Sequence, residues 1–212
     1  MKRILFLAAY LLSPAIPVAI YVSSLGGSID PYTLSVGLGV YAFIMICNQL
    51  ILASRPGFAV SALGIKGLLT LHGIAPFFIL AIAATHRMLK ELSGFPDDTV
   101  QATFGAVALL TFAAAVVFAL LFIANFRMPF QAAIRKLRTR AAEAFKLTYK
   151  ASRAFHNVTV AACAVLVTHV LLASSSAFSA NPAGAAWMAA WATLAIGMFL
   201  RYRIRGRPTP KA

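Results

Sequence analysis

The sequence predicts an all-α integral membrane protein, a six-helix bundle in a single domain that covers residues 1–212. Hydrophobic residues make up 61% of the chain and charged residues only 11%, and the mean hydropathy is +0.84, whereas soluble domains carry about 25% charged residues. Six apolar stretches approach or reach the roughly 17–25 residues that a helix needs to cross a hydrocarbon core about 30 Å thick. They cover residues 4–22, 34–53, 67–87, 103–124, 155–174 and 185–200.

The first stretch needs a separate argument, because Lys2 and Arg3 before a short apolar segment also describe a secretory signal peptide. The stretch stays apolar past Pro14 and Pro17 as far as Val22. We therefore expect a retained first helix. A cleaved signal would instead leave five helices and an external N-terminus.

The connections between the spans, at 23–32, 54–66, 88–102, 125–154 and 175–184, are rich in turn-forming or charged residues. With the N-terminus inside, 17 of the 19 Lys and Arg residues fall on the cytoplasmic side, as the positive-inside rule requires. Only Arg87 and Lys90 fall outside. This bias predicts that both termini lie in the cytoplasm, and it explains the net charge of +14 without nucleic acid as a partner. We expect the protein to lie in a bacterial cytoplasmic membrane.

All four histidines lie in two of the six spans, the third and the fifth. His72 and His86 are 14 residues apart, and His156 and His169 are 13 apart, which is about 21 and 20 Å along a helix. Both spans run from inside to outside, so His72 shares a depth with His156, and His86 with His169. Two such pairs, stacked across the membrane, are the ligand set that two bis-histidine b-type haems need.

One feature of the fifth span does not fit simply, since a 13-residue step turns about 140° around a helix. A tightened turn or a crossing of the helices could absorb this rotation. Two other interpretations of the histidines stay open: structural side chains bonded to neighbouring backbone, and ligands of a different metal ion. Zinc or manganese pathways and proton relays usually bring carboxylates into the membrane, and these spans contain none.

The segments around the histidines are 66–72 (KGLLTLH) with 84–86 (ATH), and 153–157 (RAFHN) with 167–169 (VTH). In these segments the chain resembles the ferric reductase-like transmembrane domain family, which includes ferric reductases, the membrane part of NADPH oxidases and the haem subunit of methionine sulfoxide reductase systems. The resemblance implies six helices that hold two haem b groups between the third and the fifth. It assigns His72 and His156 to the inner iron, and His86 and His169 to the outer iron.

Two departures from the family stand out. Gly73 follows the first histidine, where many relatives carry an arginine. Relatives of the oxidase type also continue into flavin and nicotinamide domains, and we expect no such site within this chain. A G-x-G-x-x-A match at Gly37, Gly39 and Ala42 lies inside the second span, so it is not expected to bind a nucleotide.

The resemblance implies the membrane component of an oxidoreductase, ferric reductase-like and without a catalytic residue of its own. A cytoplasmic flavoprotein or another electron donor would supply electrons on the inside, and an external acceptor would take them up. Two other functions stay open. One is a quinone-linked cytochrome b subunit of a larger redox complex, and the other is a non-redox transporter or scaffold.

Basic residues at the span ends are candidate contacts for anionic haem propionates: Lys66 and Arg153 for the inner haem, and Arg87 for the outer one. The 126–153 connection carries eight basic residues against one acid, and its apolar residues recur at three- or four-residue steps. It is therefore expected to form an amphipathic helix that binds anionic lipids and could receive the donor. Thr85 and Thr168, directly before the outer histidines, are expected to bond their own helix backbone.

Overall fold

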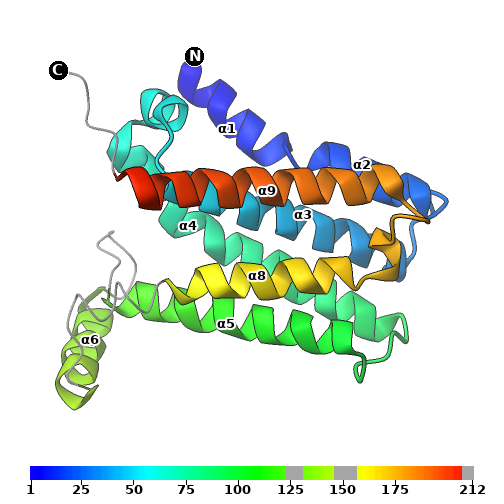
Figure 1. The fold of residues 1–212 in the computed structure, drawn as a ribbon. Coiled ribbons are helices and arrows are strands. Elements are labelled where there is room, and N and C mark those ends of the chain that lie inside the picture. Colours follow the sequence, from blue (N-terminus) through cyan, green and yellow to red (C-terminus); the bar gives the residue numbers. More distant parts are fainter. Residues whose placement is uncertain (123–130, 146–156, 207–212) are drawn as a thin grey trace.

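A computed structural model of the chain describes residues 1–122, 131–145 and 157–206, and these residues form helices and short connections without a β-strand. The long helices run side by side along one axis (Figure 1). The elements in chain order are α1 (Lys2–Leu12), α2 (Ala15–Ser24), α3 (Pro31–Ala53), α4 (Gly57–Leu92), α5 (Val100–Phe122), α6 (Gln131–Phe145), α8 (Val158–Leu171), the 3₁₀ turn η1 (Ser174–Ser176) and α9 (Pro182–Arg205).

Five helical segments among the described residues are long and apolar enough to cross a membrane: Lys2–Ser24, Pro31–Ala53, Gly57–Leu92, Val100–Ala119 and Pro182–Arg205. They agree with five of the six predicted spans and indicate an integral membrane protein. The fifth predicted span, 155–174, corresponds to α8, of which 14 residues are described. Its first residues, 155 and 156, lie outside the described part of the chain.

Two spans are not single straight helices. The first is divided into α1 and α2 at Ser13 and Pro14, because a proline cannot donate the backbone hydrogen bond that would continue α1. The helix α4 begins ten residues before the predicted span, at Gly57, and is interrupted at Gly64, where φ is 68° and ψ is 163°. The part of α4 that crosses the bundle therefore begins after Gly64, close to the predicted position 67.

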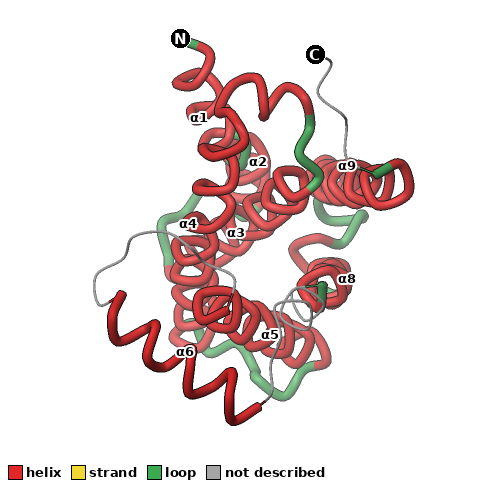
Figure 2. The backbone as a smooth tube through the Cα atoms, turned by 90° about the vertical axis from the view of Figure 1, so that its left-hand side faces the viewer, coloured by secondary structure: helices red, strands yellow, loops and turns green. Residues whose placement is uncertain are grey.

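The bundle has two different ends. The connections α2–α3, α4–α5 and α8–α9 gather at one end, which we call the loop end, at the right of Figure 1. At the opposite end, α6 lies across the bundle, beside the last turn of α5 (Figures 1 and 2). We call this the α6 end. The predicted helix in the 126–153 connection is thus present as α6, and it runs transverse to the spans.

Helix starts at the loop end follow ordinary capping rules. Asp30 precedes Pro31 and accepts a hydrogen bond from the backbone N–H of Thr33 at 2.9 Å, so it caps the N-terminus of α3. The hydroxyl of Ser28 also donates to this carboxylate, and these hydrogen bonds lower the pKa of Asp30 to about 2. Asn181 caps α9 in the same way, by accepting from the N–H of Gly184.

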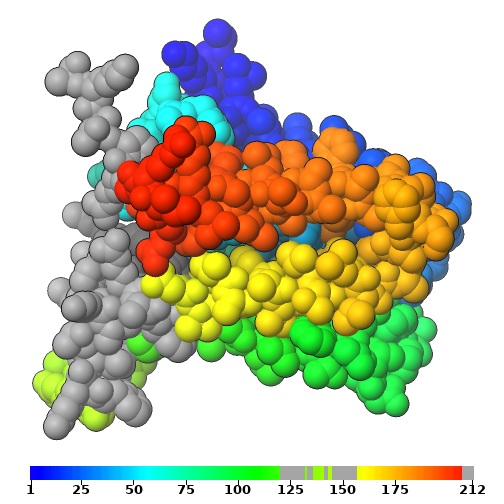
Figure 3. All heavy atoms as spheres, in the orientation of Figure 1, coloured from blue at the N-terminus to red at the C-terminus, as the bar shows by residue number. Residues whose placement is uncertain are grey.

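The helix α3 is the centre of the molecule. Of its most apolar 18-residue stretch, 67% is buried, against 22% or less for the other four spans. It packs on α4 along one side and on α2 and α9 along the other. A second close pair is formed by α5 and α8. Figure 3 shows α9 and α8 next to each other on one face, with α5 below them.

A buried polar network fixes α1, α3 and α9 relative to one another. The side-chain amide of Asn48, only 6% exposed, donates to the hydroxyl of Ser13 at 2.8 Å and accepts from the indole N–H of Trp191 at 3.0 Å. In a bilayer a lost partner cannot be replaced by water. The network therefore links three helices whose other contacts are largely apolar.

We expect Asn48→Leu to lower the stability of the detergent-solubilised protein by about 1–2 kcal/mol, because it leaves the N–H of Trp191 unpaired. Thermal unfolding followed by circular dichroism measures this. Trp191→Phe, which keeps an aromatic ring beside Trp187, is expected to destabilise similarly. The double variant should then lose less than the sum of the two, and strict additivity would contradict a direct bond.

Candidate functional site

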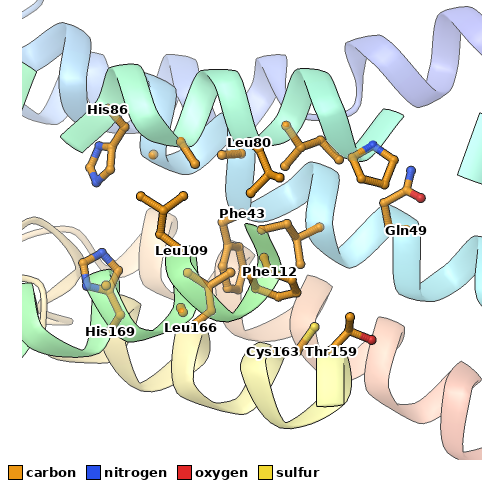
Figure 4. Close-up of a pocket in the computed structure, with 18 of the residues that line it drawn as sticks. Phe43, Gln49, Leu80, His86, Leu109, Phe112, Thr159, Cys163, Leu166 and His169 are labelled. Atoms are coloured by element: carbon orange, nitrogen blue, oxygen red, sulfur yellow. The ribbon is translucent and has the colours of Figure 1, made fainter. Parts of the chain in front are cut away.

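The two close helix pairs enclose a cavity of about 1500 Å³, larger than the roughly 300–1,000 Å³ of an ordinary ligand pocket. Its wall comes mainly from α3, α4, α5 and α8, and it extends along much of the bundle (Figure 4). Most side chains in the wall are apolar, among them Phe43, Leu80, Leu109, Phe112 and Leu166. The cavity is thus suited to a large and mainly apolar molecule.

Two of the four predicted histidines face each other across this cavity near the loop end. His86 projects from α4 and His169 from α8, toward one another (Figure 4). Their ring centroids are 6.3 Å apart, and the ring planes are nearly perpendicular, at 79°. The structure therefore brings together the two residues that were expected to share the outer depth.

Each of these imidazoles is bonded to a backbone carbonyl of a neighbouring helix. Nδ1 of His86 lies 2.8 Å from the carbonyl oxygen of Ser35 in α3, and Nδ1 of His169 lies 2.8 Å from that of Gln101 in α5. A carbonyl oxygen can only accept, so Nδ1 carries the proton in both rings. This leaves the lone pair on Nε2, the nitrogen that is available to bind a metal.

A glycine lies behind each imidazole, four residues after the carbonyl that holds it. A Cβ atom added to Gly39 would lie 2.8 Å from Cε1 of His86, and one added to Gly105 would lie 2.8 Å from Cε1 of His169. Both distances are shorter than real Cβ atoms show. The same arrangement, a carbonyl at one position and a glycine one turn later, thus seats both rings.

The spacing of the two rings fits one metal ion between them. Imidazole nitrogens bind transition metals at about 2.0–2.1 Å, and the nitrogen lies about 1.1 Å from the ring centroid, so two opposite ligands have centroids about 6.2–6.4 Å apart. The described residues contain no cluster of three or more His, Cys, Asp or Glu that could hold a bare metal ion. A haem fits the pair better, because the porphyrin supplies the four remaining ligands.

The inner pair is described only in part. His72 lies on α4 and lines the cavity, 14 residues or about 21 Å before His86. Its expected partner His156 lies outside the described residues, as does Arg153. A haem between His72 and His156 stays a prediction.

Gln49, which the sequence did not single out, lies at the level of His72. The helices α3 and α4 are antiparallel, and Ser35 meets His86. A step of 14 residues along each helix therefore brings Gln49 to the depth of His72. Gln49 is 9% exposed and lines the cavity, and its Oε1 has no hydrogen-bond partner among the described residues. A buried acceptor of this kind usually has a partner, and the described residues do not supply one.

The predicted cations are placed differently from one another. Lys66 and Arg87 both line the cavity. The guanidinium of Arg87, however, pairs with Glu91 one turn later, with Nε and Oε1 2.7 Å apart and both side chains about half exposed. A third cation of α4, Lys90, lies three residues after Arg87, also lines the cavity and was not predicted as a contact.

The threonines that precede the outer histidines donate hydrogen bonds to the backbone of their own helix, as predicted. Thr85 donates to the carbonyl of Ala81 at 3.0 Å, and Thr168 donates to that of Ala164 at 3.1 Å. Each hydroxyl therefore donates its hydrogen bond to its own helix and not to a group in the cavity. Ser35 is different, since its hydroxyl donates to the carbonyl of His86 and lies 3.0 Å from Nδ1.

Comparison with known proteins found no matching family model, no curated protein and no solved structure with significant similarity to this chain.

We expect Gly39→Ala and Gly105→Ala each to push one imidazole away from its carbonyl and to weaken haem binding at one site about 10- to 100-fold, as loss of ligand orientation does elsewhere. Titration of the purified protein with haem, followed by absorbance, measures this. Gly197→Ala is the matched control, because its added Cβ meets no atom within 4 Å. Equal affinities in all three variants would show that these glycines do not seat the rings.

Proposed function

We propose that this protein is a di-haem b-type cytochrome that carries electrons across a bacterial cytoplasmic membrane, as the membrane component of a ferric reductase-like system. The observation that carries the proposal is the facing pair His86 and His169. Both rings are fixed through Nδ1, and their 6.3 Å separation suits one iron atom.

The residues of the chain have three tasks in this function. His86 and His169 would hold one haem, and His72 and His156 the other; a bound haem supplies a one-electron redox centre. Ser35 and Gln101 keep the imidazoles in one tautomer and one orientation, so that little rearrangement accompanies a change of charge. The apolar wall keeps water away, which tunes the reduction potential.

The charge distribution supports a direction for the electrons. The α6 end carries Lys2, Arg3 and the basic residues of α6 and of the last turns of α9, so by the positive-inside rule it faces the cytoplasm. A cytoplasmic flavoprotein or another donor would approach this end, where α6 also meets anionic lipids. The loop end, with the His86–His169 pair, then faces the external acceptor.

The decisive experiment is the optical spectrum and the haem-to-protein ratio of protein purified from haem-replete cells. We expect two low-spin b-type haems per chain. His86→Leu and His169→Leu should each remove the same haem, and His72→Leu and His156→Leu should each remove the other. A ratio near one would contradict the two-haem proposal, and the absence of a Soret band would favour a non-redox transporter or scaffold.

The donor side separates the proposal from the quinone-linked alternative. We expect a reduced flavoprotein to reduce the haems of the isolated protein, since α6 offers a basic surface at the proposed cytoplasmic end. Stopped-flow absorbance with a reduced flavoprotein and with a quinol analogue compares the two donors. Rapid reduction by the quinol analogue alone would contradict the proposed donor and favour a subunit of a quinone-linked complex.

A further inference from the structure

We infer that Lys90 forms a carboxylate-binding site at the loop-end mouth of the cavity. The inference deepens the proposed function and rests on it where the carboxylate belongs to a bound haem. The same chemistry could also come from a soluble electron acceptor that carries carboxylates, and the experiment below distinguishes the two sources.

The position of Lys90 is the first argument. Lys90 lies in the last turn of α4, four residues after His86, so the two side chains are on the same face of the helix. Both line the cavity, together with His169 and Phe95. A molecule held between His86 and His169 would therefore reach Lys90 at its loop-end edge.

The ammonium group is also fixed in place. Its Nζ lies 4.1 Å from the ring centroid of Tyr32, in the first turn of α3, and 4.0 Å from that of Phe95, in the α4–α5 connection. These distances are within the range of cation–π contacts. Two rings from different elements thus hold a half-buried cation at the mouth instead of letting it extend into water.

No acid in the described part of the chain forms an ion pair with this cation. The one salt bridge there joins Arg87 to Glu91. Asp97, on the α4–α5 connection, also lines the mouth and is exposed, but it is not within ion-pair distance of Lys90. Partial burial of an ammonium is unfavourable unless an anion compensates it, and aromatic faces supply only part of that compensation.

A carboxylate is the anion that suits this position. It accepts hydrogen bonds from an ammonium group at full charge, and it can be attached to the planar, apolar molecule for which the cavity is suited. Arg87, the other cation of this turn, is already engaged by Glu91. Lys90, which has no ion pair among the described residues, is therefore the stronger candidate of the two for the carboxylate, and Arg87 also lines the cavity.

The test compares Lys90→Gln, Lys90→Arg and wild type, with Arg203→Gln as a control. Arg203 is also a cation near an aromatic ring, 6.0 Å from that of Phe199, but it does not line the cavity. Three ligands are used: haem, haem dimethyl ester, in which both carboxylates are blocked, and citrate. Absorbance titration measures the first two, and equilibrium dialysis measures citrate with or without haem.

If the carboxylate belongs to haem, Lys90→Gln should weaken haem binding about 10- to 100-fold at the site that contains His86, as expected for one charged hydrogen bond. Lys90→Arg should restore most of it. The dimethyl ester should bind wild type and Lys90→Gln equally. If the carboxylate belongs to a soluble acceptor, only citrate binding should weaken, with haem affinity unchanged.

Either of those results supports the site. Unchanged binding of both haem and citrate in Lys90→Gln, or equal losses in Arg203→Gln, would overturn it. The proposed function has its own test: it fails if the wild-type protein binds no haem in the absorbance titration. In that case the citrate measurement still decides whether Lys90 binds a carboxylate.

Discussion

The hydrogen bond from each imidazole Nδ1 to a backbone carbonyl of the neighbouring helix is the interaction on which the site depends. It satisfies a polar N–H inside an apolar bundle, where water cannot do so. It also fixes the tautomer, so that Nε2 faces the cavity. The ring can reach the carbonyl only because a glycine lies one turn later, at Gly39 and at Gly105. Imidazole, carbonyl and glycine therefore form one unit, which the structure uses twice.

The arrangement of the helices agrees with this unit. His86 ties α4 to α3, and His169 ties α8 to α5, and these are also the two pairs that pack most closely. The space between the pairs is left as the cavity. A void of this size in a helical bundle loses many packing contacts, which a large apolar ligand would restore. The ammonium of Lys90, which has no ion pair among the described residues, lies at the loop end of this cavity and suits an anionic group, and the unbonded Oε1 of Gln49 lies at the level of His72.

The burial of α3 and the hydrogen bonds of its Asn48 support the same site. Its polar residue Asn48 faces away from the pair that α3 makes with α4 and bonds Ser13 and Trp191. Through these bonds α3 is held between the broken first span and α9. The carbonyl of Ser35 is thus presented from the most buried helix of the molecule, which suits a group that must orient a ligand to within a fraction of an ångström.

The sequence by itself predicted a membrane protein, the approximate spans, and the levels of His72, His86 and His169. Hydropathy is a local property, and the helical rise converts His72 and His86 into two levels without any knowledge of packing. It did not predict the breaks at Pro14 and Gly64 or the backbone carbonyls that bond the two imidazole rings. It also did not predict the role of Gly39, whose sequence pattern suggested only a nucleotide motif that was rejected. Every residue has a backbone carbonyl, so the sequence does not show which carbonyl bonds a side chain. The role of a glycine likewise depends on which atom packs against it in the folded chain. Likewise, Arg87 and Lys90 are equal as basic residues at a helix end, and only the tertiary structure decided that one pairs with Glu91 while the other lies over two rings at the mouth of the cavity.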